Sequence, residues 1–195
     1  MSGRAALDDS APMLFTIGHS NHALERFLAL LGAHRIDALV DARSQPYSRH
    51  AAHFNRERLS RSLEAARIQY RFLGAELGGR PAAPEFYDAE GHVLYARLAE
   101  SPRFRAAIDA IAQDANRLRI AVLCSEEDPR HCHRKLLIAR VLRARGVAVL
   151  HVRGDGRVEA EPADAVDPQL ALLADASDTA WRSTRPVPRR TPHRA

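Results

Sequence analysis

The hydrophobic positions fall into short apolar runs, separated by segments in which apolar residues recur every three or four positions. The runs are rich in aliphatic and β-branched residues and stop at glycine, aspartate or a polar cluster, which is typical of buried strands. They predict five strands, at residues 14–17, 36–40, 70–73, 120–123 and 147–150.

The segments between these runs carry helix start and stop signals. Ser101-Pro102 and Asp128-Pro129 each combine a capping side chain with a first-turn proline. Gly146 is placed to end the last helix. Helices are therefore predicted after Ser20 or Asn21, at about 55–67, after Ser101, and from Asp128 to Gly146.

Strands that alternate with helices and are continuously apolar predict an α/β fold: a three-layer, mostly parallel five-stranded sheet with helices on both faces. Right-handed crossovers restrict the topology, and the strand order 3-2-1-4-5 is expected. In such sheets the ligand lies outside the carboxyl ends of the strands, at the point where the winding reverses. That point is expected between the first and fourth strands.

A chain of 195 residues has material for one domain and short extensions. We expect a flexible lead-in at 1–12, a single α/β domain at 13–176 and a disordered Arg/Pro-rich tail at 177–195. Two cysteines cannot form a disulfide scaffold and are expected to be reduced thiols in the cytoplasm. No apolar run is long enough to cross a membrane, and the first residues lack the layout of a signal peptide.

The net charge of +5 is unevenly distributed. Five of the 29 basic residues lie in 182–195, so the rest of the chain balances 24 basic against 24 acidic residues. Arginines also concentrate between Arg43 and Arg71. The helical part of that segment is expected to be a solvated face, and the loop before it a rim that attracts an anion, where Tyr47 and Phe54 can stack a base.

Side chains that can take part in catalysis or ligand binding follow three of the predicted strands and begin the helix after the fourth strand. Because the carboxyl ends of parallel strands meet at one edge of the sheet, we expect these side chains to converge on one crevice. The candidates are His19, Ser20, Asp41, Arg43, Tyr47, Ser48, Cys124, Glu126, Cys132, His133 and Arg134.

Within this set, His19 and Glu126 form the expected acid/base pair. Arg43 and Arg134 are expected to hold an anion, the latter near the positive end of its helix. Asp41 would then orient either His19 or Arg43.

The two cysteines are candidate nucleophiles. Cys132 lies near the expected start of a helix and beside two histidines, so it is expected to be the more ionised thiol. Cys124 ends an apolar strand with Glu126 nearby and is expected to stay protonated. A redox disulfide or a metal site with His131 and His133 also remains open. A cysteine-phosphatase loop ending at Arg130 does not fit, because acidic residues fill the loop.

These same positions resemble the signature blocks of a bacterial family, the domain of unknown function 488 (DUF488). The resemblance covers about 15–149, in the right order. It rests on Thr16-Ile17-Gly18-His19-Ser20, Asp41-x-Arg43-x-x-Pro46-x-Ser48, Leu77-Gly78-Gly79, Cys124-x-Glu126 and Cys132-His133-Arg134. It implies an α/β fold and a polar crevice built from these blocks, and it carries no settled activity.

Two functions follow as hypotheses. The first is an enzyme that acts on an anionic, phosphate- or nucleotide-containing ligand in the crevice. The second is a non-catalytic nucleic-acid-binding module that uses the Arg43–Arg71 segment and the basic tail. The chain outside residues 182–195 carries no net charge, which favours the enzyme hypothesis. The sequence names no cofactor, metal or oligomeric state.

Overall fold

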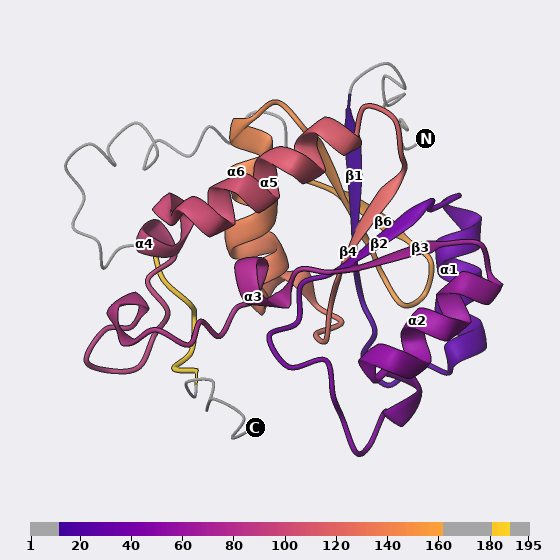
Figure 1. Ribbon diagram of the computed structural model, residues 1–195, viewed down its shortest axis with the longest axis horizontal. Coiled ribbons are helices and arrows are strands. Elements are labelled where there is room, and N and C mark those ends of the chain that lie inside the picture. Colours follow the sequence, from indigo (N-terminus) through magenta and orange to yellow (C-terminus); the bar gives the residue numbers. More distant parts are fainter. Residues whose placement is uncertain (1–11, 162–180, 188–195) are drawn as a thin grey trace, which may run out of the picture.

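The computed structural model describes residues 12–161 and 181–187, and its centre is one six-stranded sheet (Figure 1). The first five strands are parallel, and the sixth runs antiparallel to the fifth. In chain order the strands are β1 (Met13–Gly18), β2 (Ala38–Asp41), β3 (Gln69–Phe72), β4 (Ile120–Cys124), β5 (Ala148–Val152) and β6 (Val158–Ala160). The predicted α/β class and mostly parallel sheet are thereby confirmed.

The strand order is β3-β2-β4-β1-β5-β6, so the predicted order 3-2-1-4-5 and the count of five strands are wrong. The strand β4 lies between β2 and β1: Ile120 pairs with Leu14 on one side and with Ala38 on the other. Every residue of β4 is buried, which suits a strand with neighbours on both edges. Because β1 and β4 remain neighbours, their carboxyl ends still meet.

Helices cover both faces of the sheet, as predicted (Figure 1). On one face α1 (Leu24–Ala33) and α2 (Arg56–Ala65) bury Phe27 and Leu59 against alternate strand residues such as Ile17. On the other face α5 (Pro102–Asp114) and α6 (Arg140–Ala144) pack with Leu14 and its neighbours. Two short helices, α3 (Gly74–Leu77) and α4 (Tyr95–Glu100), join β3 to α5, together with a 3₁₀ turn at Pro84–Phe86.

Of the predicted helix caps of α1 and α5, one is confirmed and one is wrong. The Ser101 side chain accepts a hydrogen bond from the Phe104 amide and caps α5, as predicted. In contrast, α1 begins at Leu24 without a side-chain cap, so neither Ser20 nor Asn21 has the predicted role. Ser20 has a φ of +44° and belongs to the turn that leaves β1.

The helix predicted from Asp128 to Gly146 is divided into three parts. A 3₁₀ turn at Pro129–His131 begins at the Asp128 cap, a π-helix follows at Arg134–Ala139, and α6 completes the segment. The division falls at Cys132, whose backbone is extended (φ −112°, ψ 142°). Cys132 therefore lies in a break rather than in the first turn of a long helix.

Residues 181–187 lie in the stretch that was expected to be a disordered tail, and there the chain packs against the body. The Trp181 indole donates to the Leu136 carbonyl at 2.8 Å, and the Ser183 amide donates to the Val93 carbonyl at 2.9 Å. The expectation therefore does not hold for this segment. The rest of the tail and lead-in residues 1–11 lie outside the described residues. Across 12–161 and 181–187, no helix combines the length and apolar character that a bilayer crossing requires.

Candidate functional site: a two-thiol pocket at the sheet edge

A cavity of about 390 Å³ opens at the carboxyl ends of β1, β2 and β4. This volume lies within the usual range for small-molecule sites. Most of the predicted site residues line it: His19, Arg43, Tyr47, Ser48, Cys124, Glu126, Cys132 and His133. The cavity wall also includes His131, which the sequence offered only as a possible metal ligand. It further includes residues that the sequence did not single out as site residues: Ser44, Gln45, Gly79, Arg80, Tyr95, Ser125 and Val187. Three predicted residues, Ser20, Asp41 and Arg134, are not part of the lining.

Asp41 lies behind the pocket and holds Arg43. It is fully buried and receives the Arg43 Nε at 2.8 Å, the Arg43 Nη2 at 2.6 Å and the Arg43 backbone amide at 3.1 Å. The Tyr70 hydroxyl donates to the same carboxylate at 2.7 Å. Of the two partners expected for Asp41, the structure therefore pairs it with Arg43.

Arg43 lines the pocket although its side chain is only 4% exposed. Its Nη2 also donates to the Phe54 carbonyl at 2.9 Å, so the Nε and Nη2 groups are committed to the protein. The Nη1 nitrogen has no hydrogen-bond partner among the described residues. A rigid, buried guanidinium with one uncommitted nitrogen is suited to binding an anion.

His19 is buried and stacks on Phe54, with ring centroids 4.5 Å apart. Its Nδ1 lies 2.8 Å from the Ser20 carbonyl and must donate to it, which leaves Nε2 as a hydrogen-bond acceptor. Burial, followed by the charge of Arg43, lowers the pKa of His19 to about 4. At neutral pH the ring is therefore an uncharged proton acceptor.

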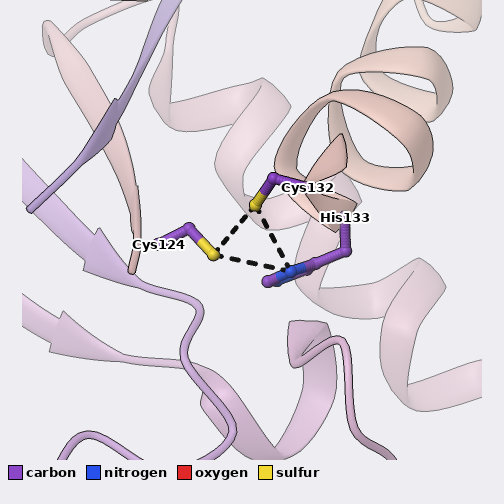
Figure 2. Close-up of side chains that lie close together, drawn as sticks. All are labelled: Cys124, Cys132 and His133. Atoms are coloured by element: carbon purple, nitrogen blue, oxygen red, sulfur yellow. Dashed lines mark hydrogen bonds between the residues drawn. The ribbon is translucent and has the colours of Figure 1, made fainter. Parts of the chain in front are cut away.

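The two thiols and one imidazole form a compact cluster at the end of β4 (Figure 2). The Sγ atoms of Cys124 and Cys132 are 3.0 Å apart. The Nδ1 of His133 is 3.6 Å from the Cys124 sulfur and 3.8 Å from the Cys132 sulfur. On the far side of the ring, Nε2 donates to the Ala42 carbonyl at 3.2 Å, so Nδ1 faces the sulfurs.

The cluster shifts the pKa values of the two thiols in opposite directions. The hydrogen bond from Cys132, supported by His133 and Arg134, holds the pKa of Cys124 well below its usual range. Burial and the neighbouring Cys124 sulfur raise the pKa of Cys132. Burial lowers the pKa of His133, but the charge of Cys124 and its hydrogen bond outweigh that effect and raise it.

This is the reverse of the sequence-based prediction, in which Cys132 was the ionised thiol. That prediction assumed a helix start under Cys132 and cationic neighbours around it. The chain instead breaks at Cys132, and the exposed His131 forms no hydrogen bond with it among the described residues. His133 directs its Nδ1 between both sulfurs, with the shorter distance to Cys124.

Arg134, which was predicted to hold an anion, does not line the pocket. It is fully buried, and its Nη1 and Nη2 donate to the carbonyls of Glu126 and Glu127 at 2.5 and 2.6 Å. The loop after β4 is thereby held against β1, where a Cβ on Gly18 would lie 1.8 Å from the Glu126 carbonyl oxygen. Arg134 therefore shapes the loop that follows Cys124, while the exposed Glu126 lies at the pocket mouth.

The structure divides the basic segment from Arg43 to Arg71, whose loop was predicted to be an anion-attracting rim and whose helix was predicted to be a solvated face. Arg43 belongs to the pocket interior, and Arg71 pairs with Asp114 at 2.5 Å. Tyr47 is 70% exposed at the pocket mouth, whereas Phe54 is fully buried and cannot stack a base. Five arginines of the segment are exposed and are not part of the pocket lining: Arg49, Arg56, Arg58, Arg61 and Arg67.

The fold and the pocket define an α/β protein with a polar, thiol-containing site at the carboxyl edge of its sheet. The family model described as "Domain of unknown function DUF488" matches residues 23–141, which is more than half of the chain. The protein belongs to this family, as its signature blocks indicated. Comparisons with curated proteins and with solved structures gave no match.

Proposed function

We propose that the protein is a cytoplasmic enzyme that binds a small anionic molecule in this pocket and attacks it with the Cys124 thiolate. The observation that supports this proposal most directly is that Cys124 lines the pocket and accepts a hydrogen bond from Cys132, with the two Sγ atoms 3.0 Å apart. A thiolate stabilised in this way at neutral pH is a nucleophile. Cys124 replaces Glu126 as the leading candidate for the chemistry.

Two further side chains support an anionic ligand and a proton transfer. Arg43 contributes the uncommitted Nη1 group from a fixed guanidinium, because Asp41 and Phe54 hold the rest of it. Neutral His19 contributes an unprotonated Nε2 that can take a proton from the ligand. Glu126 remains the candidate acid at the mouth of the pocket.

The nucleic-acid-binding alternative has less support from the described residues. Arg71 pairs with Asp114, and Arg182 of the tail pairs with Asp88 at the body surface. Salt-sensitive binding would then depend on the exposed arginines around α2 and on tail residues outside the described part of the chain.

The proposal is tested by alkylating the reduced full-length protein with iodoacetate and with iodoacetamide, which differ mainly in charge. We expect Cys124 to react at least about tenfold faster than Cys132 at neutral pH, because only Cys124 is a thiolate. We also expect the ratio of iodoacetate to iodoacetamide rates to exceed the ratio measured for N-acetylcysteine. Peptide mass spectrometry assigns each label.

Arg80→Ala and Arg61→Ala are the matched variants. Arg80 lines the pocket, whereas Arg61 is exposed on α2. Removing a pocket charge should lower the iodoacetate preference about fivefold, since an exposed pair at contact is worth about 1 kcal/mol, and Arg61→Ala should leave it unchanged. Equal labelling of the two thiols, or a charge preference no greater than that of N-acetylcysteine, would refute the proposal.

A further inference from the structure

We propose that Cys124 and Cys132 are a redox pair that reduces low-molecular-weight disulfides bearing a carboxylate. This inference rests on the proposed function, because it takes Cys124 as the attacking group and Arg43 as the group that binds the carboxylate. It adds a second functional thiol, a reaction class and a substrate class.

The first support is the position of the two sulfurs. They lie 3.0 Å apart, and a disulfide bond is about 2.05 Å long, so a shift of about 1 Å would join them. Both residues line the same pocket, and Figure 2 shows their side chains pointing toward one another from the end of β4 and from the break before the π-helix. Cys132 can therefore reach any adduct formed on Cys124.

The reaction balances in two exchanges. In the first, the Cys124 thiolate attacks one sulfur of the substrate RS–SR, a bond forms between the Cys124 sulfur and that sulfur, and RS⁻ departs. In the second, the Cys132 thiol loses its proton and attacks the Cys124 sulfur, the protein disulfide forms, and the second RS⁻ departs. The substrate gains two electrons, and the two protein thiols lose them.

The cluster also orders these two steps. While Cys124 is a thiolate, its charge keeps the proton on Cys132, so the second thiol does not compete for the substrate. Once Cys124 is part of a mixed disulfide, that charge is gone and Cys132 ionises more readily. His133 Nδ1, 3.8 Å from the Cys132 sulfur, is then free to take the proton.

A metal ion is the main competing occupant, because the ligand atoms of Cys124, Cys132 and His133 all lie within 4.8 Å of one another. Two thiolates on a tetrahedral zinc ion, with bonds of about 2.3 Å, would place their sulfurs about 3.8 Å apart. The separation of 3.0 Å is too short for that arrangement and fits a thiol that donates to a thiolate.

The volume of the pocket favours a disulfide over a smaller oxidant as the substrate. A cavity of about 390 Å³ leaves room for a substituent much larger than that of hydrogen peroxide. Arg43 Nη1 is the donor available to a carboxylate on that substituent. The structure therefore favours an acidic organic disulfide over a peroxide.

The test uses the reduced, full-length protein under anaerobic conditions and one equivalent of 5,5′-dithiobis(2-nitrobenzoate), an aromatic disulfide with two carboxylates. The wild type should release both aryl thiolates and end with a mass lower by two hydrogens and no adduct. Cys132→Ser should release one and retain the other on Cys124, while Cys124→Ser should react at least about tenfold more slowly. Relative to N-acetylcysteine, the wild type should also prefer this reagent to neutral 2,2′-dithiodipyridine.

The outcomes separate the inference from the proposed function. If the wild type keeps one aryl thiol on Cys124, as Cys132→Ser does, the redox pair is refuted but Cys124 remains the nucleophile. If Cys124→Ser reacts as fast as the wild type, both proposals fail. Stoichiometric zinc release when the wild-type thiols are modified, detected with 4-(2-pyridylazo)resorcinol, would refute the redox pair in favour of a metal site. The wild-type measurement needs no variant to fold.

Discussion

Asp41→Asn tests whether the pocket depends on the buried pair behind it. The carboxylate is fully buried and accepts four hydrogen bonds, three from Arg43 and one from Tyr70. Asparagine keeps the shape but replaces one acceptor oxygen with a donor group and removes the negative charge. The Arg43 guanidinium then remains buried without a counter-charge, and one of its donors or the Tyr70 hydroxyl faces another donor.

The expected cost follows from this loss. Removing one partner of a buried ion pair typically costs about 3–5 kcal/mol, because the remaining charge stays desolvated. A domain of this size has a total stability of about 5–15 kcal/mol. A loss of that size should lower the melting temperature by about 10–15 °C.

Urea unfolding followed by far-UV circular dichroism measures the effect. The control is Asp109→Asn, which breaks a pair of similar length, 2.6 Å, whose side chains are 53% exposed for Asp109 and 27% for Arg145. Such a pair should cost less than about 1 kcal/mol. The double variant Asp41→Asn/Arg43→Gln should recover part of the loss, because no charge stays buried. If Asp41→Asn costs no more than Asp109→Asn, the reasoning about the buried pair is wrong.

Three further predictions concern stability. Gly18→Ala should destabilise the protein by more than about 2 kcal/mol, because its Cβ would lie 1.8 Å from a backbone oxygen. Gly32→Ala in α1, whose Cβ meets nothing within 4 Å, should instead stabilise the protein by about 0.5–1 kcal/mol. Similar melting temperatures for the two variants would contradict this prediction. Burial holds the pKa of His19 at about 4, below its ordinary 6.5, so the unfolded chain takes up a proton first and stability should fall as pH drops from 6.5 to 4. His19→Gln should remove that part of the pH dependence, and parallel urea-midpoint profiles would refute it. Ser101→Ala should cost about 1 kcal/mol through loss of the α5 cap, measured by urea unfolding.

Local signals in the sequence predicted much of the fold. Each of the five predicted apolar runs is a strand of the sheet, and the cap at Ser101 begins α5. These features depend on residues within a few positions of one another. The order of the strands does not depend on such local signals. The strands β1 and β4 are both apolar, and only their packing decides which one lies beside β2. The antiparallel β6, short and exposed, had no apolar run to indicate it.

The sequence by itself determined that polar residues follow neighbouring parallel strands, and hence that His19, Arg43 and Cys124 share one pocket. Only the tertiary structure decided which groups surround each residue there. Arg134 donates to backbone carbonyls outside the pocket lining, and the cluster lowers the pKa of Cys124 while it raises that of Cys132. The physical reason is that pKa values and hydrogen bonds depend on distances of 3–4 Å through space, and residues far apart in the chain set those distances.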